Sequence, residues 1–170
     1  MRAFTEVQHE LWIAAPPATV RSQFADLDHH IRANVHPKLR FEILQRDAQT
    51  ARYVQEVKLL GIRQRDVFER RFEPDGTMTD TSVEGFNKDG SLRFRFAEQH
   101  EDGRIGTRVT IDIKLPLPPV VGRLIKPLLD AQVRREVHAA AQEDKRDIEV
   151  RGYRPSTAAM PTGQAYKASA

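Results

Sequence analysis

The sequence predicts an α+β fold in which a seven-stranded, curved antiparallel sheet surrounds a long C-terminal helix, with two short helices after the first strand. Three patterns predict it. Apolar and polar residues alternate from Val7 to Ile13 and again over much of Leu39 to Leu115, as in half-buried strands. Turn residues interrupt the second region repeatedly. From Pro119 to Val150 the apolar residues follow helical spacing instead.

Composition places the chain in one domain. It has 170 residues, no cysteine and a formal net charge of +3. We expect a ligand-binding domain over 1–153 and a disordered tail over 154–170, where proline, glycine and small residues lack periodicity. The lack of cysteine excludes disulfides and suits the cytoplasm, and no export signal is visible near Met1. Charges of both signs are interspersed, so we expect no nucleic-acid partner.

Two short helices are expected after the first strand. Pro16 and Pro17 suit the first turn of a helix, because a proline there loses no hydrogen bond. Asp28 is expected to cap a second helical turn, which Pro37 ends.

The turns suggest a register for the sheet. Asp102-Gly103 suits a two-residue type I′ turn, and counting back from it gives three apolar pairs: Phe96 with Val109, Phe94 with Ile111, and Leu92 with Ile113. A Leu60-Gly61 turn likewise gives these pairs: Tyr53 with Phe68, Leu59 with Ile62, and Glu56 with Arg65. Arginines then lie on the outer face in ion pairs. We interpret these pairs as contributions to register and solubility, and not as a phosphate-binding surface.

The connection between the fifth and sixth strands is expected at Asn87 to Gly90. This loop places Thr81 and Val83 on the inner face, opposite Phe96 and Phe94.

One end of the sheet is expected to be apolar. Successive hairpins alternate ends, so the loops Leu59–Ile62 and Leu115–Val121 lie together. Such loops suit the entrance for a hydrophobic ligand or a transient membrane contact. Packing of the loops against the last helix explains the same pattern.

The last helix contains two apolar faces. Leu129, Val133 and Val137 begin a stripe that anchors the helix, whereas Leu124 and Leu128 lie on a face rotated from it. Pro127 lies where one apolar face ends and the other begins, and there we expect a kink or the start of a new helix. This makes Leu124 and Leu128 candidates for ligand access.

Strong catalytic motifs are absent from the sequence. There is no phosphate-binding glycine loop, dinucleotide fingerprint or serine nucleophile elbow. His29, His30 and His36 raise the question of a metal. Adjacent residues point apart on a helix, and no cysteine or obvious carboxylate completes a ligand set, so we predict neither a metal nor a cofactor.

Polar residues expected on the inner face are more informative. They are His9, Gln55, Gln64, Asp66, Arg70, Thr79 and Thr81. Buried polar groups need partners, so these residues either bond to one another or orient a ligand. The set as a whole favours a ligand site. In an enzyme, His9 or Asp66 would transfer protons and Arg70 would stabilise an enolate.

The order of elements resembles the helix-grip fold of the START/SRPBCC superfamily. This superfamily includes Bet v 1-like proteins, bacterial polyketide cyclase or dehydrase-like proteins and coenzyme Q-binding-like proteins. The stretches that carry the resemblance are Val7–Phe24, with Ala14-Ala15-Pro16-Pro17, and Gly122–Val150, with Pro127. The resemblance implies a hydrophobic cavity between sheet and helix, used by members for lipid, quinone, hormone or polyketide binding and occasionally for catalysis.

We therefore expect binding or transport of a small hydrophobic ligand, with a polyketide cyclase or dehydratase as the alternative. The expected ligand-binding residues are Tyr53, Gln55, Val57, Leu59, Gln64, Phe68, Thr81, Val83, Phe94, Phe96, Val109, Ile111, Ile113, Leu124 and Leu128.

Overall fold

A computed structural model describes residues 3–156 of the chain. Its elements are β1 (Phe4–Ile13), α1 (Pro17–Ala25), α2 (Leu27–Arg32), β2 (Arg40–Arg46), β3 (Thr50–Leu59), β4 (Ile62–Phe72), β5 (Met78–Gly85), β6 (Ser91–Glu101), β7 (Arg104–Pro116) and α3 (Gly122–Glu149). The strands form one antiparallel sheet in the order β1-β7-β6-β5-β4-β3-β2. The predicted α+β helix-grip architecture is confirmed.

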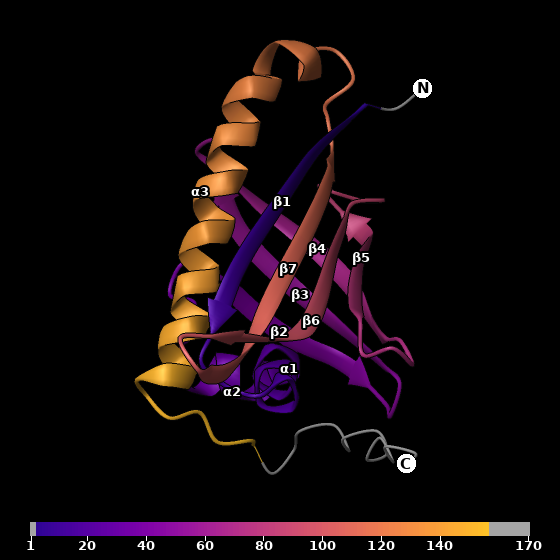
Figure 1. The fold of residues 1–170 in the computed structure, drawn as a ribbon. Coiled ribbons are helices and arrows are strands. Elements are labelled where there is room, and N and C mark those ends of the chain that lie inside the picture. Colours follow the sequence, from indigo (N-terminus) through magenta and orange to yellow (C-terminus); the bar gives the residue numbers. More distant parts are fainter. Residues whose placement is uncertain (1–2, 157–170) are drawn as a thin grey trace.

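The long helix covers one face of the sheet unevenly. Figure 1 shows α3 running beside β1, with α1 and α2 together at the end where α3 finishes. The helix packs chiefly along β1 and makes few contacts with β3. Leu129, Val133 and Val137 are buried, as their stripe predicts. The side of α3 that faces β2 and β3 is therefore the side on which a cavity can remain.

Most of the predicted register is confirmed. In the β6–β7 hairpin Glu101 pairs with Arg104 and Phe94 with Ile111. The β3–β4 hairpin turns at Leu60-Gly61, where both residues have positive φ. Its pairs include Tyr53 with Phe68.

The predicted pairing of β5 with β6 is wrong. Thr81 pairs with Ser91, and Met78 is the residue opposite Phe94. The connection is longer than the expected loop, because Ser82 N donates to Gly90 O and Asp89 N to Ser82 O. An irregularity in the pairing of β4 with β5 at Val67/Phe68 adds a further shift.

This shift exchanges the two faces of β5, since the side-chain period of a strand is two residues. Asp80 and Ser82 are buried on the inner face, and Thr81 is exposed.

Two local expectations about the helices are also corrected. The N-cap of α2 is Asp26 and not Asp28, and its side chain accepts a hydrogen bond from His29 N. Pro127 lies inside α3, which is one continuous helix from Gly122. The expected start of a new helix at Pro127 is therefore wrong, whereas the expected kink stays a prediction, because Pro127 cannot donate a hydrogen bond to Arg123 O.

The first residues of the expected tail are packed against the domain. Ser156 donates to Asp26 through both its backbone N–H and its hydroxyl, and Tyr153 OH donates to the same carboxylate. The remainder of the expected tail, 157–170, lies outside the described residues. Among the described helices, none is long and apolar enough to cross a bilayer.

Candidate functional site

A cavity of about 180 Å³ lies between α3 and the inner face of the sheet. Its apolar wall is formed by Phe24, Leu27, Leu39, Phe41, Val57, Leu59, Phe68, Leu92, Phe94, Ile111, Ile113, Leu115, Val133, Val137, Ala139, Ala140 and Ala141. Polar atoms reach it from Gln55, Asp66, Arg70, Asp80, Asn87 and the histidines of the α2 region. A mostly apolar wall with few polar groups is the usual composition of a small-molecule site.

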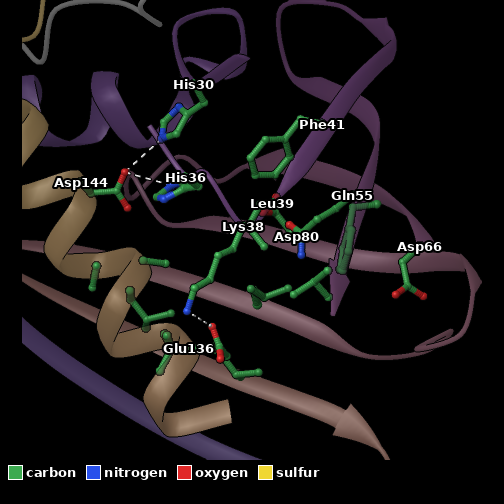
Figure 2. Close-up of a pocket in the computed structure, with 18 of the residues that line it drawn as sticks. His30, His36, Lys38, Leu39, Phe41, Gln55, Asp66, Asp80, Glu136 and Asp144 are labelled. Atoms are coloured by element: carbon green, nitrogen blue, oxygen red, sulfur yellow. Dashed lines mark hydrogen bonds and ion pairs between the residues drawn. The ribbon is translucent and has the colours of Figure 1, made fainter. Parts of the chain in front are cut away.

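The cavity meets solvent beside Lys38. Among the lining residues, Lys38 alone is exposed. Figure 2 shows its side chain extending toward Glu136 of α3, and the Lys38 Nζ to Glu136 Oε2 distance is 3.7 Å. The mouth therefore lies between the segment after α2 and the middle of α3, with an ion pair across it.

Gln55 is a polar lining side chain with unused hydrogen-bonding capacity. It lies on β3 beside the mouth and is half-buried (Figure 2). Within residues 3–156 its amide makes no hydrogen bond to a protein group. A primary amide offers two N–H donors and one carbonyl acceptor, so Gln55 can orient a ligand of either polarity.

At the inner end of the cavity, the positive charge of Arg70 is paired with the negative charge of Asp80. Its guanidinium donates to both oxygens of Asp80 over 2.7 Å and to Phe24 O over 3.0 Å. Tyr53 OH donates to Asp80 as well, over 2.8 Å. Burial and the neighbouring Asp80 carboxylate raise the pKa of Tyr53 well above its ordinary value. This geometry makes Arg70 part of a fixed ion pair.

Asp66 is likewise held by protein donors. It accepts from Asn87 N over 2.6 Å, from Asn87 Nδ2 over 2.8 Å and from Ser82 Oγ over 3.3 Å. Gln64 accepts from the same Asn87 amide over 2.9 Å. Asp66 therefore anchors the β5–β6 connection.

The largest group of buried ionisable residues joins α2 to α3. His30 Nε2 lies 3.0 Å and His36 Nε2 3.2 Å from Asp144 Oδ1, and His36 Nδ1 lies 2.8 Å from Glu143 Oε2. Burial would lower the pKa of His36, but Asp144 and Glu143 raise it to about 10. Burial would raise the pKa of Asp144, but the two histidines hold it well below its ordinary value.

A further histidine–carboxylate pair, His29 with Asp147, lies next to this group. His29 Nε2 contacts Asp147 Oδ2 over 2.7 Å, and Gln23 Nε2 bridges Asp144 and Asp147 over 3.0 and 3.1 Å. His29 and His30 point to different carboxylates, as expected for adjacent helical residues. The expectation that no carboxylate completes a ligand set is wrong, because the folded chain brings Asp144 to His30 and His36.

Most of the sequence-predicted residues lie around the cavity. Those that line it are Tyr53, Gln55, Val57, Leu59, Asp66, Phe68, Arg70, Phe94, Ile111 and Ile113. Asp80, Asn87 and Asp144 also line it and were not predicted to do so, and His30 and His36, expected at a solvated helix end or at the rim, line it as well.

Several predicted residues do not line it. Phe96 packs edge-on against Phe24, and Val109 is fully buried in the core. Gln64 bonds to Asn87, whereas Thr81 and Val83 are displaced by the β5 shift.

The predicted access residues and His9 lie elsewhere too. Leu124 and Leu128 are 84% and 62% exposed on the first turns of α3. His9 faces α3, where its ring packs edge-on against His138 at 5.3 Å. Burial and His138 lower the pKa of His9. Of the candidate catalytic residues, Asp66 and Arg70 therefore line the cavity, whereas His9 lies outside it.

The apolar end of the sheet is partly closed. Leu59, Leu115 and Leu117 are buried, and Leu60 N donates to Gln132 Oε1 of α3 over 2.6 Å. Large apolar residues that stay exposed at this end include Ile62, Phe86, Val120, Val121, Leu124 and Leu128.

The fold is similar to that of START/SRPBCC and Bet v 1-like proteins of known structure. One similar structure is the protein TTHA0849 from Thermus thermophilus, with a TM-score of 0.74 and 20% identity over 87% of this chain and 99% of the other. Another is the ZhuI aromatase/cyclase from Streptomyces sp. R1128, with a TM-score of 0.67 and 18% identity over 88% and 99%.

A START superfamily protein from Mycobacterium smegmatis has a TM-score of 0.67 and 16% identity over 84% of this chain and 98% of the other. No protein-family model and no curated protein sequence matches the chain. At these identities the likeness establishes the fold, and function has to be argued from the cavity.

Proposed function

We propose that this protein binds a small hydrophobic molecule that carries one hydrogen-bonding group. The observation that carries the proposal is the apolar cavity of about 180 Å³ with the Gln55 amide exposed to it. A dry apolar cavity of roughly 150 Å³ is large enough for benzene, so this one has room for about one ring without rearrangement. A quinone or phenol ring meets both requirements, and a longer tail would leave past Lys38.

The direct test is titration of the purified protein with a short-chain benzoquinone, 2-naphthol and decanoic acid, followed by calorimetry or NMR. Gln55→Leu keeps the side chain near its original size and removes the amide. Loss of one hydrogen bond of about 0.5–1.5 kcal/mol should weaken binding about 2–10-fold.

Val57→Trp should fill the cavity and abolish binding, because Val57 lines it. Leu128→Trp is the matched control, since Leu128 lies on the surface. Absence of binding by the wild type, or equal binding by Val57→Trp, would overturn the proposal.

Cyclase or dehydratase activity is the alternative, supported by the likeness to an aromatase/cyclase. The pairing of Arg70 with Asp80 and of Asp66 with Asn87 argues against the roles first assigned to these two side chains. Turnover of a linear poly-β-ketone that is lost in Val57→Trp would support the alternative. Lack of turnover by the wild type would contradict it.

We further propose transient membrane contact through the start of α3. Val120 and Leu124 are 92% and 84% exposed there, next to the exposed Arg123. Apolar side chains beside a cation suit the interface of anionic vesicles. Leu124→Asp should abolish sedimentation with such vesicles, and Ile31→Asp, at an apolar residue of α2 that is 44% exposed, should not. Equal sedimentation of both variants would contradict the contact.

A further inference from the structure

The side chains of His30, His36 and Asp144 converge at the edge of the cavity. They come from α2, from the segment after it and from the last third of α3, and all three line the cavity. One ligand atom from each lies within 4.8 Å of the other two. Figure 2 shows both rings directed at the Asp144 carboxylate.

The separations between these atoms suit metal coordination. Zn–N and Zn–O bonds of about 2.0–2.2 Å at tetrahedral or octahedral angles put neighbouring ligand atoms about 3.0–3.5 Å apart. The two histidine Nε2 atoms lie 3.0 and 3.2 Å from Asp144 Oδ1. The two histidine nitrogens lie within 4.8 Å of each other, and a cation between the three atoms would draw the rings together.

The other nitrogen of each ring is already held by an acceptor. His30 Nδ1 lies 2.8 Å from Asp26 O, and His36 Nδ1 lies 2.8 Å from Glu143 Oε2. With Nδ1–H donating to these acceptors, Nε2 of each ring is the atom that would give up its hydrogen to bind a metal. Histidine ligands of metals are oriented by this kind of outer hydrogen bond.

Hydrogen bonding alone satisfies this cluster poorly. Asp144 Oδ1 lies within 3.2 Å of three nitrogen atoms, from Gln23, His30 and His36, although an oxygen offers two lone pairs. With hydrogens on all four ring nitrogens, two cationic rings would stack 5.0 Å apart at 28° in a buried site. One divalent cation replaces the two Nε2 hydrogens with no change in total charge and removes the contact between like charges.

We propose that His30, His36 and Asp144 bind a divalent transition metal ion of the Zn²⁺ or Fe²⁺ type. Two imidazoles and one carboxylate leave coordination positions open, and they favour such ions over Mg²⁺ and Ca²⁺, which prefer oxygen ligands. All three residues line the cavity, so an ion held by them can use an open coordination position for a donor atom of a bound ligand. This site is separate from the hydrophobic binding proposed above and does not depend on it.

Calorimetric titration of chelator-treated protein with Zn²⁺, and with Co²⁺ followed by its visible absorption, tests the site. One ion per chain and a rise in Tm are expected. His36→Gln and His30→Gln should abolish this binding. His29→Gln is the matched control: it changes the neighbouring residue of the same helix, which contacts Asp147 instead, and should retain binding. Glu143→Leu should weaken binding about 10–100-fold, because it removes the acceptor of the outer hydrogen bond from His36 Nδ1.

A measurement on the wild type keeps the proposal testable if a variant fails to fold. Zn²⁺ should shift the NMR resonances of the His30 and His36 ring nitrogens while leaving those of the exposed His100 unchanged. No stoichiometric Zn²⁺ or Co²⁺ binding, unshifted His30 and His36 resonances, or undiminished binding by folded His36→Gln would each overturn the assignment. None of these measurements uses the hydrophobic ligand, so their failure leaves the proposed function standing.

Discussion

Replacement of Asp80 by asparagine should destabilise the protein strongly. The side chains of Arg70 and Asp80 are only 6% and 1% exposed, so Arg70 would lose its counter-charge in a site from which water is excluded. Breaking a buried ion pair from one side costs about 3–5 kcal/mol. In a chain of this size that corresponds to a fall in Tm of about 6–20 °C.

Urea denaturation of a small variant set measures this effect. Tyr53→Phe removes one hydrogen bond to the same carboxylate and should cost about 1.5–3 kcal/mol. Arg70→Met combined with Asp80→Leu removes both charges and should lose less stability than Asp80→Asn alone. A loss below about 1 kcal/mol in Asp80→Asn would refute the buried pair. Such a small loss would also mean that Arg70 does not depend on Asp80 and that its charge is available to a substrate.

Three further predictions concern backbone, packing and pH. Gly85→Ala should lower Tm more than Gly61→Ala, because both have positive φ but only at Gly85 would a Cβ lie 2.3 Å from a backbone oxygen; equal losses would contradict this. Leu129→Ala should cost about 2–5 kcal/mol in urea, whereas Leu124→Ala should stay within about 0.5 kcal/mol; a comparable loss in both would contradict the burial. Because folding lowers the pKa of His9 from 6.5, its contribution to stability is complete above pH 6.5 and is lost as the pH falls from there through the lower pKa of the folded state. His9→Leu should therefore lose less Tm than the wild type between pH 7.5 and 5, and an equal loss would contradict the pKa shift.

The sequence predicted the fold well where local turn chemistry determines register. Asp102-Gly103 predicts a hairpin with a two-residue loop, and the positive φ values of both residues match the predicted type I′ turn. Between β5 and β6 the turn signals Asn87 to Gly90 were visible, but the added length of the connection was not. It depends on hydrogen bonds that Asn87 donates to Asp66, 21 residues away, and sequence spacing does not reveal such contacts.

The histidine cluster was missed although the helix contains a signal for it. Val137, Ala141, Asp144 and Ile148 follow the spacing of one buried stripe, so Asp144 occupies a position where the pattern predicts an apolar residue. A carboxylate buried on such a stripe requires a cationic or hydrogen-bonding partner. The unassigned His30 and His36 were the available partners, but only the packing of α2 against α3 brings them together.

The pairing of buried charges determines which ligands the metal-free cavity should prefer. Arg70 and the histidines are matched by acidic residues, so a carboxylate entering the cavity would lose water without gaining an unpaired cation. We therefore expect 2-naphthol to bind more tightly than 2-naphthoate at neutral pH, with its hydroxyl donating to the Gln55 carbonyl. Calorimetry in the presence of a chelator makes this comparison, because chelation prevents a metal at Asp144 from attracting the carboxylate. Tighter binding of the naphthoate under these conditions would mean that one of the buried cations is available to ligands.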